Sequence, residues 1–301
     1  MESRTTTTND APAVIRVLSI QSSVVHGYVG NKASMFPLQL LGFDVSPIHT
    51  VQFSNHTGYR TWTGYKFTGS HLSDIIRGLM VNQVADYDYI LTGYVGNIDL
   101  LESLANLLPG LKSDPKTRFL CDPVMGDSGR LYVPEEFVDL YRIKIVPFAD
   151  VLLPNQTEAE LLTGKQIVNA DDAAEACRIL HELGPKIVII TSLDQRNSNR
   201  IETFVSESNR GCWRFWVDRV EAVYFGTGDT IAALCLAWLH RYPVELAIGL
   251  ALRTLRAIIN RTHAAGSQEL LLIQSRDEIL DPFHLPEVHS EVYCRNQVTT
   301  S

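Results

Sequence analysis

Several common signatures of enzyme chemistry are missing from this sequence. It has no Walker A pattern, no G-x-G-x-x-G after the first apolar run, and no H-E-x-x-H among its nine histidines. The first absence excludes a P-loop NTPase, and the second argues against a Rossmann-type dinucleotide site. The third argues against a catalytic zinc ion. Any phosphate chemistry in this chain must therefore come from another arrangement of residues.

Cysteine, positive charge and long apolar runs are also scarce. The five cysteines are scattered and never form C-x-x-C, which is typical of reduced thiols in a cytoplasmic protein. The net charge is −8 and no basic stripe occurs, so we expect no nucleic-acid partner. No apolar run reaches about 18 residues, so we expect no membrane partner either.

The composition is that of an ordinary globular protein, with 45% hydrophobic and 20% charged residues in a chain of 301. Residues 1–12 are polar and rich in threonine, which favours a disordered tail. No linker or internal repeat divides the rest of the chain. Residues 13–301 are therefore interpreted as a single domain.

Apolar runs and amphipathic segments alternate along this domain. The alternation predicts an α/β fold with three layers, α/β/α, around a central and mostly parallel sheet. The expected strands cover 16–21, 43–49, 89–92, 117–121, 150–153 and 187–190, and a hairpin covers 201–206 and 213–219. The expected helices cover 31–41, 72–81, 98–108, 135–145, 159–162, 171–183, 229–239 and 244–260. Residues 52–66 follow neither period and are interpreted as a functional loop.

The most informative stretch is 223–234, where an apolar run turns through Gly226, Thr227 and Gly228 before Asp229 and a helix. Glycines at the start of a helix leave backbone N–H groups free of any neighbouring Cβ, and these groups attract anions. A carboxylate beside an anion site has a purpose when it takes a proton from a nucleophile that attacks phosphate. The alternative is that Asp229 only complements the helix dipole.

Other polar residues follow the predicted strands at the point where each strand ends. In parallel sheets ligands bind beyond these carboxyl ends, so together the residues outline one cleft. They are Ser22, Gly93, Tyr94, Asp122, Asn155, Thr191, Ser192 and the 226–229 turn.

Three acids in this set, Asp122, Asp127 and Glu158, have the hard oxygen ligands that hold Mg²⁺ through waters and nucleotide phosphates. A structural interpretation stays open for two of them. Asp122 would cap a turn before Pro123, and Glu158 would begin a helix.

At this point the sequence resembles a known family, the pyridoxal kinases of the ribokinase-like superfamily in their eukaryotic form. The resemblance covers about residues 16–276. The G-T-G-D of 226–229 marks only the superfamily, whereas the first strand and the run Q-F-S-N-H-T-G-Y at 52–59 point to pyridoxal kinase. The other matching segments are G-Y-V-G-N at 27–31, F-P-L-Q at 36–39, L-T-G-Y at 91–94, C-D-P-V-M-G-D at 121–127, P-N-Q at 154–156 and E-A-E at 158–160.

The resemblance implies a reaction. ATP would phosphorylate the 5′-hydroxymethyl group of pyridoxal, pyridoxine or pyridoxamine in the salvage of vitamin B6. Asp229 would be the general base, and the N–H groups of Gly226, Thr227 and Gly228 would form the anion hole and contact ATP. The family also implies Mg²⁺ or another divalent ion, a monovalent cation such as K⁺, a homodimer and a cytoplasmic location.

The resemblance also assigns binding residues. Ser22 and Thr57 would form hydrogen bonds with the substituents of the pyridine ring. The ring itself would lie against Val29, Phe53, His56 and Tyr94. Magnesium, the monovalent cation and the triphosphate would be organised by Asp122, Asp127, Asn155 and Glu158. Thr191 and Ser192 would contact the nucleotide.

This chain departs from the family pattern in two places. The segment Ser128–Leu131, expected to cover ATP, is shorter than in the mammalian enzymes. Leu153 stands where the family usually has threonine. Leucine there either weakens the binding of ATP or the monovalent cation, or simply faces the core.

Three other functions stay open. A kinase of the same fold that acts on hydroxymethylpyrimidine is disfavoured by the 52–59 run. A non-catalytic vitamin carrier is disfavoured because a binding protein has no need of a base such as Asp229. A structural interaction module has no repeat, linker or apolar stripe to support it.

Overall fold

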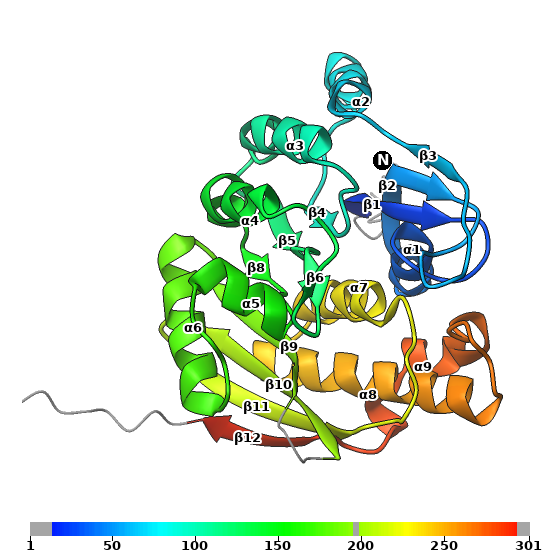
Figure 1. Cartoon of the computed structure of the whole chain (residues 1–301), viewed down its shortest axis with the longest axis vertical. Coiled ribbons are helices and arrows are strands. Elements are labelled where there is room, and N and C mark those ends of the chain that lie inside the picture. Colours follow the sequence, from blue (N-terminus) through cyan, green and yellow to red (C-terminus); the bar gives the residue numbers. More distant parts are fainter. Residues whose placement is uncertain (1–13, 195–198, 294–301) are drawn as a thin grey trace, which may run out of the picture.

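The computed structural model describes residues 14–194 and 199–293. The predicted tail, residues 1–12, lies outside the described residues. A ten-stranded sheet in the order β12-β11-β10-β9-β8-β5-β4-β1-β2-β3 runs through the molecule (Figure 1). Its strands are β1 (Ile15–Val24), β2 (Phe43–Phe53), β3 (Gly64–Lys66), β4 (Tyr89–Thr92), β5 (Arg118–Cys121), β8 (Val151–Leu152), β9 (Ile187–Asp194), β10 (Arg200–Glu207), β11 (Gly211–Asp218) and β12 (His289–Tyr293).

The centre of this sheet is parallel. Strands β2, β1, β4, β5, β8 and β9 pair in parallel, whereas β3 and the β10–β12 group pair antiparallel at the two edges. The carboxyl ends of the parallel strands therefore meet along one edge, which is where ligands bind in such sheets. The predicted mostly parallel sheet is confirmed.

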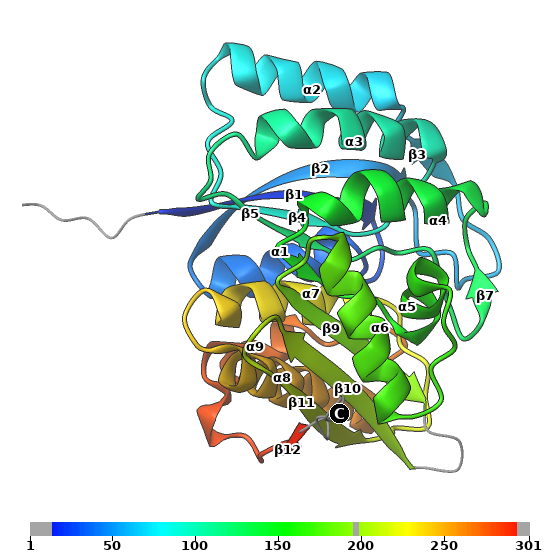
Figure 2. The same cartoon turned by 90° about the vertical axis from the view of Figure 1, so that its left-hand side faces the viewer.

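Helices cover both faces of the sheet (Figure 2). Alternate strand residues enter different cores because side chains alternate across a strand. Leu18, Ile90 and Ile190 pack under α2 to α6, and Val17, Leu91 and Ile189 pack under α1, α7, α8 and α9. The helices are α1 (Asn31–Leu40), α2 (Gly69–Val81), α3 (Ile98–Leu111), α4 (Glu136–Leu140), α5 (Gln156–Thr163), α6 (Ala170–Leu183), α7 (Thr227–Leu239), α8 (Val244–Ala264) and α9 (Arg276–Leu280).

Some predicted boundaries were wrong. The helix expected to end at residue 108 runs through Pro109 to Leu111, because a proline near the end of a helix removes only its own N–H. The helix expected over 135–145 changes at Tyr141 into a single π-helical turn. The strand expected to end at residue 49 continues to Phe53 and forms part of the predicted loop.

The last forty residues, whose pattern is weak, provide α9 and the edge strand β12. Across the described ranges, no helix combines the length and the apolar character that crossing a membrane requires.

Candidate active site

The turn before α7 has the backbone geometry expected of an anion site. Gly226 is the N-cap of α7 with a φ of 82°, and a Cβ on it would lie 1.8 Å from the carbonyl oxygen of Tyr28. Only glycine fits this position, because the conformation and the contact both exclude a side chain. Gly226 has no side chain with which to cap α7, so the N–H groups at the start of the helix are left to other acceptors, and that of Asp229 bonds to the carboxylate of Asp229 itself.

Gly228 differs from Gly226. It lies inside α7 without a positive φ, and a Cβ on it would meet only the Oδ2 atom of Asp122, at 3.9 Å. Residue 228 therefore faces the acidic side of the cleft. A glycine at residue 228 leaves open space above the helix N-terminus, and no unusual backbone angle requires it.

Asp229 occupies the first turn of α7 and is half-buried. Burial raises the pKa of its carboxyl group above the usual value, while hydrogen bonds from the backbone N–H groups of Gly30 and Asp229 itself lower the pKa. The hydroxyl group of Ser34 donates to the carbonyl oxygen of Asp229 at 3.0 Å. Gly30 and Ser34 come from the loop after β1 and from α1, so the first βα unit holds the predicted base.

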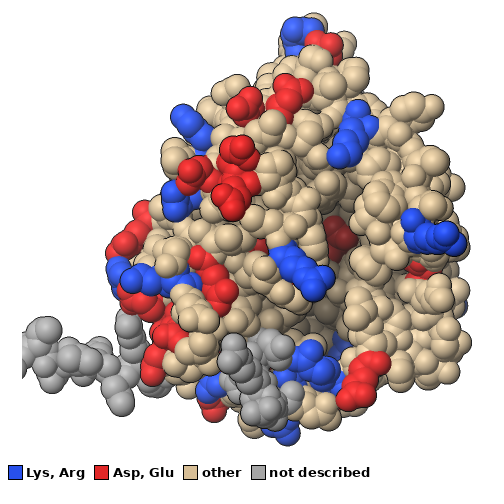
Figure 3. Space-filling model, in the orientation of Figure 1, with Lys and Arg blue, Asp and Glu red and all other residues tan. Residues whose placement is uncertain are grey.

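Asp122 follows β5 and is buried beside α7. Burial raises its pKa well above the usual range, and the negative charges of Glu158 and Asp229 raise it further. Burial also raises the pKa of Glu158, to about 8, although backbone N–H groups of Asn155, Met125 and Gly126 oppose the shift. Like charges gathered in a buried place favour a bound cation. Figure 3 shows acidic atoms at the bottom of a hollow near the centre of one face, with basic atoms on its rim.

The short segment predicted to cover ATP is a two-stranded hairpin of β6 (Gly126–Asp127) and β7 (Arg130–Leu131). Ser128 and Gly129 form its turn with φ of 51° and 75°, the positive values that a tight two-residue hairpin requires. The backbone N–H of Gly129 donates to Oγ1 of Thr157 at 2.9 Å, which ties the turn to α5. The hairpin is thus short but anchored.

Asp127 and Glu158 have different surroundings. Asp127 is exposed, and its Oδ1 accepts from the backbone N–H of Ser128 at 2.7 Å. Glu158 is buried, and its Oε1 accepts from the N–H of Met125 at 2.9 Å. Among the residues that the structure describes, no three His, Cys, Asp or Glu side chains are grouped so as to hold a metal ion by themselves. A divalent ion here would need phosphate and water ligands as well.

Asn155 begins α5 through a capping box with Glu158. Its Oδ1 accepts from the N–H of Glu158 at 3.0 Å, and its Nδ2 donates to the carbonyl oxygen of Gly126 at 2.7 Å. The structural interpretation of Glu158 as a residue that begins a helix is therefore correct. Thr191 pairs with Asn155 in a parallel bridge, and Ser192 has a φ of 56°.

The residues predicted to wall the vitamer lie at the other side of the cleft. Val29 and Tyr94 pack against Phe53 in one small apolar cluster. The pairing of β1 with β2 shifts register between Gln21 and Ser23, so a bulge places the buried Ser22 beneath Gly30. His56 is buried and Thr57 is exposed, both on the loop after β2.

Several residues that shape the site were missed from the sequence. Tyr28, Gly30 and Thr157 act through backbone approach or single hydrogen bonds, as described above. Phe225 stacks on the ring of His56, with centroids 4.2 Å apart, and Glu269 binds the same histidine. The two glycines of G-Y-V-G at 27–30 were a visible signal for a tight loop. No feature of the sequence around Glu269 indicated a role in the site.

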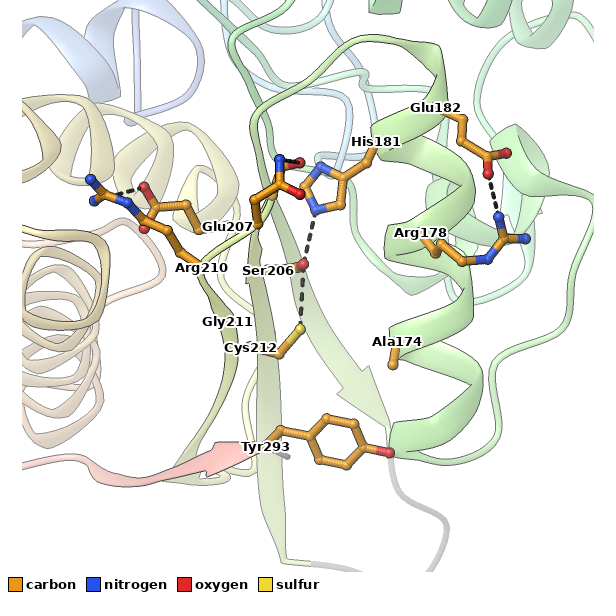
Figure 4. A pocket seen from close by; sticks show the side chains of 12 residues that line it. Ala174, Arg178, His181, Glu182, Ser206, Glu207, Arg210, Gly211, Cys212 and Tyr293 are labelled. Carbon is orange, nitrogen blue, oxygen red and sulfur yellow. Dashed lines mark hydrogen bonds and ion pairs between the residues drawn. The ribbon is translucent and has the colours of Figure 1, made fainter. Parts of the chain in front are cut away.

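A second hollow, of about 560 Å³, lies between α6 and the β10–β11 hairpin (Figure 4). Its polar side chains are bonded to one another: Nε2 of His181 is 2.8 Å from Oγ of Ser206, to which Cys212 donates. None of the predicted site residues lines this hollow. It lies near the start of β9, whereas the predicted cleft lies at the other end of that strand.

Comparison with known proteins adds independent observations. The chain is 45% identical to the pyridoxal kinase of Arabidopsis thaliana over 89% of this chain and 92% of that protein. It is 39% identical to the pyridoxal kinase of Homo sapiens over 89% of this chain and 96% of the human protein. The chain belongs to the pyridoxal kinase family. The predicted kinase is thereby confirmed.

A solved structure agrees with this assignment. The pyridoxal kinase of Leishmania donovani, in complex with ADP and pyridoxine, matches with a TM-score of 0.85 and 37% identity. The match covers 92% of this chain and 99% of that one. The ribokinase-like three-layer fold expected from the sequence is therefore confirmed.

A family model described as phosphomethylpyrimidine kinase matches residues 65–272. This range begins after Ser22, Val29, Phe53, His56 and Thr57, so it covers the phosphate side of the cleft and omits most of the predicted vitamer wall. The relatives named above match a larger share of the chain, 89% in each case. The model and the relatives are consistent, since both describe kinases of this fold.

Proposed function

We propose that this member of the pyridoxal kinase family uses Asp229 as the general base when ATP phosphorylates the 5′-hydroxymethyl group of pyridoxal, pyridoxine or pyridoxamine. The observation that carries the assignment is the position of the carboxylate in the first turn of α7, beside a helix N-terminus whose N-cap residue, Gly226, has no capping side chain. If Asp229 only complemented the helix dipole, an exposed acid would serve as well as one half-buried in a cleft. A hydroxyl group that attacks phosphate does need a proton acceptor.

The migrating phosphoryl group would lie on the N–H groups of Gly226, Thr227 and Gly228, which stabilise charge without reorganisation. Asp229 would accept the hydroxyl proton, and its raised pKa brings it closer to the working pH. Asp122, Asp127 and Glu158 would hold Mg²⁺ together with phosphates and water, which neutralises the charge of the triphosphate. A monovalent cation such as K⁺ belongs to the same side of the cleft.

The two substrates would approach from opposite sides. Val29, Phe53 and Tyr94 would contact the pyridine ring, and His56 would lie beside them. Ser22 and Thr57 would form hydrogen bonds with the substituents of the ring. Asn155, Thr191 and Ser192 would contact ATP at the ends of β8 and β9. We also propose that the enzyme works as a homodimer in the cytoplasm, as the family resemblance implies.

Asp229→Asn tests the base directly. The variant should bind ATP and pyridoxal normally but lose about 10²- to 10⁴-fold in kcat, the usual contribution of a general base. The matched control is Glu245→Gln, which removes an exposed first-turn acid from the neighbouring helix α8. If both variants kept wild-type kcat, Asp229 would be only a helix-dipole residue.

The vitamer is tested with a substrate panel. A coupled ADP-release assay should show higher kcat/KM for pyridoxal than for hydroxymethylpyrimidine. The opposite preference would favour the pyrimidine kinase that the family model names. Binding of pyridoxal without any ADP release would favour the vitamin carrier.

A further inference from the structure

Glu269 lies on the segment after α8, far in sequence from every predicted site residue. Its side chain is only 14% exposed. Its Oε1 is 2.7 Å from the hydroxyl oxygen of Tyr59 and 3.1 Å from Nε2 of His56, and its Oε2 accepts from the N–H of Tyr28 at 3.2 Å. This carboxylate therefore joins the loop after β1 to the loop after β2.

Two hydrogen bonds, one at each ring nitrogen, hold His56 in one form. The N–H of Gly58 donates to Nδ1 of His56 at 3.1 Å, so that nitrogen carries no proton. The proton is then on Nε2, where it is donated to Glu269. The ring fixed in this way stacks on Phe225 with an interplanar angle of 23°, and Phe225 directly precedes the anion turn.

A second line of contacts runs from Glu269 through the loop after β1. Glu269 binds the N–H of Tyr28, and the carbonyl oxygen of Tyr28 lies against Gly226. Two residues further on, the N–H of Gly30 holds the carboxylate of Asp229. Gly27 leaves space for the carboxylate, since a Cβ there would lie 2.3 Å from Oε2 of Glu269.

We propose that Glu269 is a positioning residue that aligns the vitamer wall with the anion turn and the base. One carboxylate reaches the first loop through Tyr28 and the second loop through His56 and Tyr59. It acts through these residues rather than on the reacting atoms. The proposal rests on the proposed function, since the alignment matters only if the two loops wall the vitamer.

The main experiment is steady-state kinetics of Glu269→Ala, Glu269→Gln and Tyr59→Phe with pyridoxal and ATP. Glu269→Ala should raise the KM for pyridoxal at least about tenfold, the effect of losing one hydrogen bond to a charged group. The KM for ATP should change less than the KM for pyridoxal, because Glu269 bonds directly to the two loops and reaches the anion turn only through Tyr28 and through His56 and Phe225. Gln268→Ala, a change at the adjacent exposed residue, should match the wild type.

Glu269→Gln and Tyr59→Phe should fall between the wild type and Glu269→Ala. The glutamine keeps an acceptor oxygen for His56 and Tyr59, but its amide group faces the N–H of Tyr28. Phenylalanine at residue 59 removes one of the three hydrogen bonds. This graded order is the signature of positioning, and it also decides the matter if Glu269→Ala fails to fold. Equal changes in both KM values, or no change in any variant, would overturn the proposal.

Nitrogen NMR of the histidine rings gives a readout that is independent of turnover. The His56 signal, assigned by its loss in His56→Asn, should show the Nε2–H form in both proteins, because the N–H of Gly58 still donates to Nδ1. The Nε2 resonance should nevertheless shift in Glu269→Ala, because its acceptor is lost. An unchanged Nε2 resonance in Glu269→Ala would contradict the inference even in an inactive protein. A wild-type enzyme without vitamer kinase activity but with the expected NMR change would instead overturn the proposed function.

Discussion

The carbonyl oxygen of Tyr28 lies so close to Gly226 that a Cβ on residue 226 would come within 1.8 Å of it. The loop after β1, which walls the predicted vitamer pocket, is therefore packed directly on the turn predicted to bind phosphate. A displacement of either segment moves the other. Substrate position and phosphate position are therefore coupled through backbone contact.

Gly226→Ala should disrupt this contact. The methyl group is excluded both by the positive φ and by the Tyr28 carbonyl, so the turn must move. We expect kcat to fall about 10²-fold or more, comparable with the loss of one donor to a developing anion. Gly266→Ala is the matched control, because Gly266 has a φ of 62° and no atom within 4 Å of the added Cβ. A Gly226→Ala enzyme with normal kcat would refute the anion-turn assignment.

Asp122→Asn should separate stability from activity. Removing one carboxylate from the buried group relieves repulsion by Glu158 and Asp229, so without divalent ions the Tm should rise by about 2–4 °C for each kcal/mol gained. Activity with Mg²⁺ and ATP should fall, because a cation ligand is lost. A lower Tm, measured by calorimetry without divalent ions, would show that the charge of Asp122 does not oppose folding.

The stabilising effect of Asp122→Asn should depend on pH. The folded-state pKa of Asp122 is raised above its ordinary value of 3.8, so the wild-type protein loses stability as the pH rises through that raised pKa. The asparagine variant has no such loss. The difference in Tm between the two proteins should therefore be small near pH 4 and larger near pH 8.

Thr157→Val should loosen the short hairpin over the cleft. The substitution removes the acceptor for the N–H of Gly129 and keeps the size of the side chain. We expect the KM for ATP to rise about three- to tenfold, as the loss of one neutral hydrogen bond would give, with little change in the KM for pyridoxal. Thr163→Val is the control on the same helix, because the hydroxyl group of Thr163 bonds to local backbone away from the hairpin: it donates to the carbonyl oxygen of Ala159 and accepts from the N–H of Lys165. Equal kinetics for the two variants would mean that the hairpin closes without this bond.

The sequence predicted most of the fold because hydrophobic periodicity is a local property. It also predicted that the polar residues after each strand share one cleft, since parallel strands end at one edge. It did not predict Glu269, whose role depends on three contacts to residues more than 200 positions away. The sequence also could not distinguish the roles of Gly226 and Gly228. Only the backbone structure shows that Gly226 is confined by Tyr28, whereas Gly228 is not. Long-range contacts of this kind leave no periodic trace in a single sequence.

Leu153→Thr tests the departure at the end of β8. Two accounts were open from the sequence: the missing hydroxyl group weakens the binding of ATP or K⁺, or the leucine faces the core. In the structure Leu153 is 3% exposed and packs in the core beneath α7 and α8, which favours the second account. Threonine would then remove apolar volume and bury a hydroxyl group, at a cost of about 2–5 kcal/mol.

We therefore expect Leu153→Thr to lower the Tm by at least about 4 °C, at about 2 °C for each kcal/mol in a chain of this length. The KM for ATP and the half-saturating K⁺ concentration should stay within about twofold of the wild type, because the side chain points away from the ligands. Leu153→Val is the control, since it reduces volume without adding a polar group and should cost less stability. The measurement is ATP saturation at several K⁺ concentrations, together with thermal unfolding of all three proteins. A threonine variant that binds ATP or K⁺ about three- to tenfold more tightly would reverse this conclusion, because the hydroxyl group would then have reached the cation or the phosphates.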